Sequence, residues 1–170
     1  RNSICVMDGD KLLEWSRLSY CDAKNTLDHR KKIVKQIKEY IKKYNLTKND
    51  YLLFEQIFFS KGLSRMANIT SMAFLQATLI NEFSDKINII EVHVQSWKCK
   101  VLGSRSATKE DAVALVEKNY PQVDLNIEIQ HKRKGTEICK DHDTADAICI
   151  ALYQQCVDKK KLEEHLVNYT

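Results

Sequence analysis

Three acidic residues stand at the ends of apolar segments. Asp143 and Asp146 open the apolar run 147–152, and Glu55 closes the run 51–54. Residues three apart share a helical face, so a helix beginning at Asp143 would present both carboxylates on one side. Hard cations such as Mg²⁺ and Mn²⁺ prefer oxygen ligands, and closely packed carboxylates repel one another strongly without metal. The three acids therefore predict a site for divalent metal.

Each acid also has a plainer interpretation. Asp143 is of a type that commonly caps a helix, and Glu55 can be read as a surface residue at a strand end. Capping explains Asp146 less well, because it lies inside the first turn between two alanines. Two metal ions about 4 Å apart can clamp the attacking and leaving oxygens of a phosphodiester. Taken together, the three acids favour phosphodiester chemistry.

The composition is typical of one globular domain in a reducing compartment. The chain has 170 residues, is 44% hydrophobic and contains only four glycines and one proline, which argues against long disordered linkers. No stretch approaches the roughly 20 apolar residues of a membrane span, and no signal-peptide pattern opens the sequence. None of the six cysteines forms a Cys-x-x-Cys pair, which argues against zinc. We expect a cytoplasmic protein without membrane contact.

The positive charge is clustered, although the net charge is only +4. The clusters are His29, Arg30, Lys31 and Lys32 with Lys35, Lys38, Lys42 and Lys43; Lys98, Lys100, Arg105 and Lys109; and His131, Lys132, Arg133 and Lys134. A basic helix is often only a solvated face, but three clusters around an acidic site favour a polyanionic partner. A nucleotide-binding role finds no support, because the sequence has no glycine-rich phosphate loop.

The hydrophobic pattern predicts alternating strands and helices. Strands are expected over 3–7 and 11–18, joined by a hairpin turn at Asp8-Gly9, followed by a helix over 27–44, a strand over 51–55, a helix over 64–83, a strand over 87–94, a loop over 101–106, a helix over 108–120, a strand over 122–129, a basic loop over 132–140 and a helix over 143–157. This order predicts one α/β domain over residues 1–170 with a mixed sheet.

Three stretches carry a resemblance to a known family. Residues 52–58 read as a strand ending in Glu-Gln with an aromatic shortly after, residues 98–109 contain Val-Leu-Gly followed by Ser-Ala-Thr-Lys, and residues 143–152 form an Asp-x-x-Asp-Ala segment. In this order the stretches resemble the RuvC-type Holliday-junction resolvases, which are ribonuclease-H-like nucleases. Each motif alone is weak, but the ordered set is fairly specific. So divergent a sequence would fit a phage-borne member, acting in a bacterial host cell.

The resemblance implies a ribonuclease-H-like mixed sheet flanked by helices on both faces. It also implies a homodimer that binds four-way or otherwise branched DNA and nicks two strands symmetrically with Mg²⁺ or Mn²⁺. On this reading Glu55, Asp143 and Asp146 are metal ligands and, with Lys109, the catalytic residues. The DNA-binding residues would be Phe58, Lys98, Arg105, Lys109, Lys132, Arg133 and Lys134. Plainer roles are a core aromatic for Phe58 and a solvated lysine for Lys109.

One departure concerns the first strand of the family, which ends in an Asp that completes the metal site. Two further strands follow it in the family, whereas only two strands in all precede the first helix here. The preferred interpretation is that this strand and its Asp are missing from the sequence, so that Asp8 is a hairpin residue and normal nuclease activity is lacking. The alternative makes Asp8 the fourth acid. A nuclease for flaps, or a non-catalytic nucleic-acid-binding protein of the same fold, are the competing functions.

Overall fold

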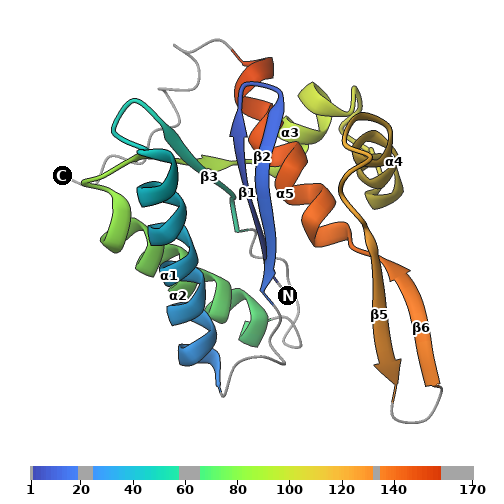
Figure 1. Cartoon of the computed structure of the whole chain (residues 1–170), viewed down its shortest axis with the longest axis horizontal. Helices are drawn as coiled ribbons and strands as arrows, with labels where there is room; N and C mark the ends of the chain where they lie inside the picture. Colours follow the sequence, from blue (N-terminus) through green and yellow to red (C-terminus); the bar gives the residue numbers. More distant parts are fainter. Residues whose placement is uncertain (1, 19–24, 58–65, 132–134, 158–170) are drawn as a thin grey trace. The chain divides into compact units, whose positions relative to one another are not determined.

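The structure, a computed structural model of the 170-residue chain, describes residues 2–18, 25–57, 66–131 and 135–157 (Figure 1). The chain divides into two units, each described here by itself. Unit 1 comprises residues 1–17 and 95–157, and unit 2 comprises residues 18–94 and 158–170. Within the described ranges, no helix combines the length and the apolar character needed to span a bilayer.

Unit 1 contains a hairpin, three helices and a second hairpin. Its elements are β1 (Asn2–Asp8), β2 (Lys11–Leu18), α3 (Val94–Val101), α4 (Lys109–Asn119), β5 (Asn126–His131), β6 (Gly135–Lys140), α5 (His142–Tyr153) and the 3₁₀ turn η3 (Gln154–Cys156). Strands β1 and β2 form one two-stranded sheet, and β5 pairs with β6 antiparallel in another. Residues from both ends of the described part of the chain therefore belong to unit 1.

The first hairpin is the one that the Asp8-Gly9 pattern predicts. Asp8 is the last residue of β1, and the next two residues form the turn into β2. Gly9 has a φ of 61°, a conformation that glycine adopts without strain and that suits a two-residue hairpin turn. Asp8 is therefore a residue at the end of a hairpin strand.

Helix α5 is the centre of the core of unit 1. It packs against β1 and α4 (Figure 1). Ala145, Ile148 and Cys149, which recur at helical spacing, have no exposed surface, and Val116 of α4 is equally buried. Burial of one such aliphatic side chain contributes about 1.5–3 kcal/mol. The core thus fixes which face of α5 points inward.

Unit 2 is built on a parallel pair of strands joined by a helix. Its elements are α1 (Thr26–Tyr44), β3 (Tyr51–Glu55), α2 (Met66–Phe83) and β4 (Asn88–Val92). Strands β3 and β4 pair in parallel from Tyr51 with Asn88 to Glu55 with Val92. One apolar face of α1 is buried at Ile33, Ile37 and Tyr40.

Two sequence predictions are wrong, each for want of long-range information. Residues 94–101 form helix α3, anchored by the buried Trp97, whereas the sequence pattern predicts the end of a strand at 94, no element over 95–100 and the start of a loop at 101. Residues 135–140 form strand β6 within the predicted basic loop, because pairing with β5 supplies their backbone hydrogen bonds. The described strands also form three two-stranded sheets, so the predicted mixed sheet is not seen as one continuous sheet.

Candidate functional site

The start of helix α5 is capped by Asp141, two residues before the first acid of the predicted site. The Oδ1 atom of Asp141 accepts from the Thr144 backbone N–H at 3.3 Å, and the Thr144 hydroxyl donates to Oδ2 at 2.5 Å. Both side chains are buried, with exposed fractions of 3% and 1%. The interpretation of Asp143 as the helix cap is therefore wrong, because Asp141 fills that role.

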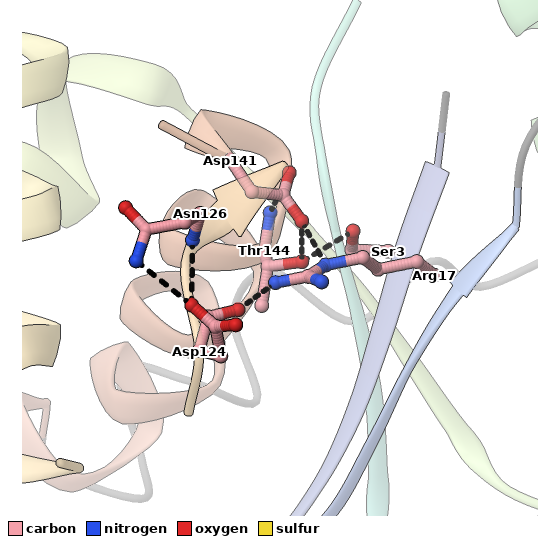
Figure 2. Close-up of polar contacts among 6 residues, drawn as sticks. All are labelled: Ser3, Arg17, Asp124, Asn126, Asp141 and Thr144. Atoms are coloured by element: carbon pink, nitrogen blue, oxygen red, sulfur yellow. Dashed lines mark hydrogen bonds and ion pairs between the residues drawn. The ribbon is translucent and has the colours of Figure 1, made fainter. Parts of the chain in front are cut away.

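A polar network holds Asp141 in place. Arg17 of β2 forms an ion pair with the Asp141 carboxylate through Nε and donates from Nη2 to the backbone carbonyl of Asp124 (Figure 2). Ser3 of β1 shares a hydrogen bond with Thr144, with 2.9 Å between the hydroxyl oxygens. The network ties the start of α5 to both strands of the first hairpin and to the segment before β5.

Asp143 and Asp146 lie just beyond this cap. Asp143 is exposed in the first turn of α5, whereas Asp146 is half-buried one turn further along. Burial first, and the Asp146 carboxylate second, raise the pKa of the Cys149 thiol to about 12. The start of a helix favours negative charge, which lowers the cost of placing two carboxylates there. The sequence prediction that both acids open this helix is confirmed.

The acid pair fits part of a divalent-metal site. Its carboxylate oxygens are the donors that Mg²⁺ and Mn²⁺ prefer, and the exposure of Asp143 leaves them accessible. Among the residues that the structure describes, however, no three His, Cys, Asp or Glu side chains gather as a metal-binding group. The pair therefore supplies two ligands and not a complete set.

Glu55, the third predicted ligand, is the last residue of β3, as the sequence predicts. It is half-buried, and the Gln76 side chain of α2 donates to its backbone carbonyl at 2.7 Å. These contacts fix the end of β3 within unit 2, whereas the α5 pair belongs to unit 1. The convergence of the three acids stays a prediction.

The start of helix α4 carries the predicted catalytic lysine. Lys109 is the first residue of α4 and is exposed, directly after the capping residue Thr108. The pKa of Glu110, the next residue, is lowered first by hydrogen bonds of its carboxylate to its own backbone and to Thr108, and then by the charge of His142. His142 is the first residue of α5, so the starts of α4 and α5 are electrostatic neighbours. Lys109 is thus in the same part of unit 1 as the acid pair.

The other predicted DNA contacts fall in different environments. The Lys98 amino group donates to the carbonyl of Ala107 at 2.7 Å, so it holds the loop that leads into α4. Arg105 is exposed in that loop. Four predicted DNA-binding residues lie outside the described residues: Phe58, Lys132, Arg133 and Lys134. The role of these residues in DNA binding stays a prediction.

The lysine cluster on α1 is partly balanced by acids. Its ion pairs join Lys32 to Asp28, Lys35 to Glu39 and Lys38 to Glu82. The nitrogen–oxygen distance of the third pair is 2.6 Å, and its hydrogen bond lowers the pKa of Glu82. His29 from the same cluster is buried. This helix is therefore a weaker candidate for a polyanion surface than the sequence suggests.

Three residues near the site were not identified from the sequence. Arg17 and Asp141 form an ion pair in which the carboxylate is buried, and the charge of His142 lowers the pKa of Glu110. The Nδ1 atom of His142 has no hydrogen-bond partner within the described residues. Asp141 and His142 could have been noticed as polar residues directly before the acid pair. Arg17 carries no such signal, because its partner lies 124 positions further along the chain.

Comparisons with known proteins support the fold. No protein-family model matches the chain, and no curated protein matches its sequence. A structure of Thermus thermophilus RuvC matches with a TM-score of 0.56 and 15% identity, covering 95% of this chain and 88% of that one. T. thermophilus RuvC in complex with a Holliday-junction substrate matches with a TM-score of 0.62 and 13% identity, covering 95% and 87%. The chain therefore has a RuvC-like fold.

Proposed function

We propose that this protein is a metal-dependent endonuclease that binds branched DNA, in particular four-way junctions, and nicks it. The observation that carries the proposal is a RuvC-like fold over 95% of the chain in which helix α5 presents Asp143 and Asp146. The RuvC of the second comparison binds a Holliday junction. A fold at 13% identity does not transmit an activity by itself. The acid pair at the start of α5 supplies the chemistry.

Each proposed site residue has a distinct task. Asp143 and Asp146 offer carboxylate oxygens from one face of α5, and Glu55 offers a third from the end of β3. Lys109, exposed at the start of α4, places a positive charge beside the phosphate that is cut and stabilises its developing negative charge. Mg²⁺ or Mn²⁺, when bound, supplies Lewis-acid stabilisation of the attacking and leaving oxygens.

The proposal is tested by cleavage of a synthetic four-way junction with Mn²⁺, by the parent chain and by Asp146→Asn and Glu55→Gln. Each variant removes one anionic ligand and keeps the side-chain volume, so we expect loss of product with junction affinity retained. Glu128→Gln is a matched control, because it makes the same change from carboxylate to amide at an exposed position of unit 1. Parental cleavage rates in both variants would rule out the assigned residues.

A second candidate is a non-catalytic junction-binding protein of the same fold, in agreement with the expectation from the sequence that normal nuclease activity is lacking. It is favoured by the absence, among the described residues, of a complete three-residue metal-binding group. It predicts junction binding whose affinity falls steeply with salt, because phosphate contacts release counterions. It also predicts no product with any divalent ion. The same cleavage assay, run beside a binding titration at two salt concentrations, separates the two candidates.

We also propose that the protein acts as a homodimer, since two symmetric nicks need two sites. Support comes from α2, where Met72 and Phe74 are 48% and 56% exposed, although such side chains are usually buried. Arg30 of α1 lies over the Phe74 ring, with 5.3 Å between its guanidinium carbon and the ring centroid. Sedimentation of the parent and of Phe74→Glu tests this. A dimer in the parent and a monomer in the variant are expected.

A further inference from the structure

We propose that Arg17 is a positioning residue for the Asp143–Asp146 pair, acting through Asp141. This inference rests on the proposed function, because it concerns how the proposed metal ligands are held. Arg17 itself contacts neither acid in the proposed pair. Its partner Asp141 is two residues before Asp143 and begins the same helix.

The first step is the way in which Asp141 is used. One carboxylate oxygen accepts from the Thr144 backbone, and the other accepts from the Thr144 hydroxyl and from Arg17 (Figure 2). The backbone N–H of Asp141 also donates to the carbonyl of Leu125 at 2.7 Å. Asp141 is thus held from several directions, and the direction in which α5 starts is held with it.

The second step is the geometry of Arg17. Its guanidinium uses Nε for the Asp141 carboxylate and Nη2 for the Asp124 carbonyl, so one planar group spans two segments of unit 1 (Figure 2). A lysine has a single nitrogen and cannot reproduce this fork. The carboxylate is 3% exposed, and a buried charge without a partner is costly. Without Arg17, the Asp141 carboxylate would be stabilised by moving towards solvent.

The third step connects this movement to the acid pair. Asp143 is in the turn that Asp141 caps, and Asp146 follows one turn later. Small rotations of the first turn therefore displace Asp143 more than Asp146, whose neighbours Ala145 and Cys149 are fully buried. The separation of the two carboxylates would change, and with it the affinity for an ion that both must contact. Residues that orient metal ligands typically contribute about 10–100-fold to metal affinity.

The test is direct Mn²⁺ binding to the full chain, followed by the electron-spin-resonance signal of free Mn²⁺. Arg17→Met should raise the dissociation constant about tenfold, and Arg17→Lys should recover part of the loss by restoring the charge without the fork. Asp141→Asn keeps a capping residue but removes the ion pair, and it should resemble Arg17→Met. Glu117→Gln is the control, because it removes the Lys140–Glu117 ion pair of the same unit and should leave the constant within about twofold.

The apparent dissociation constant equals the intrinsic constant divided by the folded fraction, so binding is measured where every variant is fully folded, and positioning is then separated from stability. Thermal unfolding of each variant identifies the temperature at which binding is measured. If Arg17→Met does not fold, Arg17→Lys and Asp141→Asn decide the question. Parental constants in the folded variants would overturn the inference. Mn²⁺ binding by a parent that does not nick junctions would contradict the nuclease proposal and leave this comparison intact, whereas a parent that binds no Mn²⁺ would overturn both.

Discussion

The starts of helices α4 and α5 lie in the same unit, and the two helices are capped in different ways. Helix α4 is closed by a capping box within four residues, in which the Thr108 backbone N–H donates to Asp111 at 2.7 Å and the Asp111 backbone N–H donates to the Thr108 hydroxyl at 3.3 Å. These contacts are exposed. Helix α5 is closed by the buried Asp141, which depends on Arg17 from a strand far away in the sequence.

The difference indicates which helix start must be rigid. A local, exposed cap stabilises a helix by about 1 kcal/mol and allows the helix end to fray. A buried cap with long-range partners loses its contacts only when the surrounding structure opens. The proposed metal ligands Asp143 and Asp146 follow the buried cap, and residues with that role would have to be held within a fraction of an ångström. Lys109 follows the exposed cap, where the flexible positive charge of the proposed catalytic lysine could still reach a phosphate.

The largest expected effect is the loss of cleavage when an acid in the first turn of α5, but not of α4, is neutralised. Asp143→Asn should lower the rate of junction cleavage about 10³-fold, which corresponds to about 4 kcal/mol. Glu110→Gln makes the equivalent change in the first turn of α4, and it should alter the rate by less than about threefold. Single-turnover cleavage with saturating Mn²⁺ measures both. Equal losses would show that the proposed distinction between the two helix starts is wrong.

The next effect is on stability and compares the two capping residues. Asp141→Ala should lower the free energy of unfolding by about 2–4 kcal/mol, because it removes a cap and the contacts that Arg17 and the Thr144 hydroxyl make with its carboxylate. This loss is smaller than that expected for a fully buried pair, because the Arg17 side chain is 36% exposed. Thr108→Ala should cost about 1 kcal/mol. Urea unfolding followed by circular dichroism measures both, and a larger loss for Thr108→Ala would contradict the comparison.

The same contrast explains how much of the structure could be predicted from the sequence. The turn at Gly9 and the starts of α1 and α4 depend on neighbours in sequence, and the predicted hairpin turn and the helices predicted over 27–44 and 108–120 agree with the structure. Strand β6 was missed because its extended structure depends on backbone pairing with β5. Helix α3 was missed because its anchor, Trp97, needs a core that no local pattern describes.

The candidate site divides in the same way. The placement of Asp143 and Asp146 at the start of a helix, and of Glu55 at the end of a strand, follows from local apolar runs. The ion pair of Arg17 with Asp141 does not, because two residues 124 positions apart carry no shared pattern. Amino-acid type alone predicts which residues are able to bind metal. Which carboxylate is buried as a cap and which is exposed is decided by tertiary packing.

A third prediction concerns the pH dependence of stability that follows from the thiols at the buried face of α5. Burial raises the pKa of the Cys5 and Cys149 thiols from 9.0 to about 12. Their contribution to stability is complete below pH 9, where both states hold the proton, and it is lost as pH rises from 9 towards 12. We expect the free energy of unfolding to fall by about 1–3 kcal/mol between pH 8 and pH 10.

Urea unfolding of the parent, Cys149→Ala and Cys156→Ser measures this dependence. Cys149→Ala removes one buried thiol, so its stability should vary less with pH, although it will be lower at every pH because a cavity remains. Cys156 is exposed, and Cys156→Ser should retain the parental pH dependence. Burial also raises the pKa of Tyr153, which steepens the same fall. A stability that is constant from pH 8 to pH 10 would contradict the prediction.

The smallest effect separates activity from stability at the start of α4. A positive charge at the start of a helix opposes the helix dipole, so Lys109→Ala should keep or raise stability by a few tenths of a kcal/mol. It should nevertheless lower junction cleavage about tenfold, or about 1.4 kcal/mol, by removing the charge beside the phosphate. Lys118, in the last turn of α4, is placed where a positive charge favours the helix. Lys118→Ala should therefore lower stability slightly and leave cleavage unchanged. If Lys109→Ala keeps or gains stability but loses cleavage, Lys109 is assigned to the reaction. If Lys109→Ala loses both stability and cleavage, Lys109 is assigned to the fold.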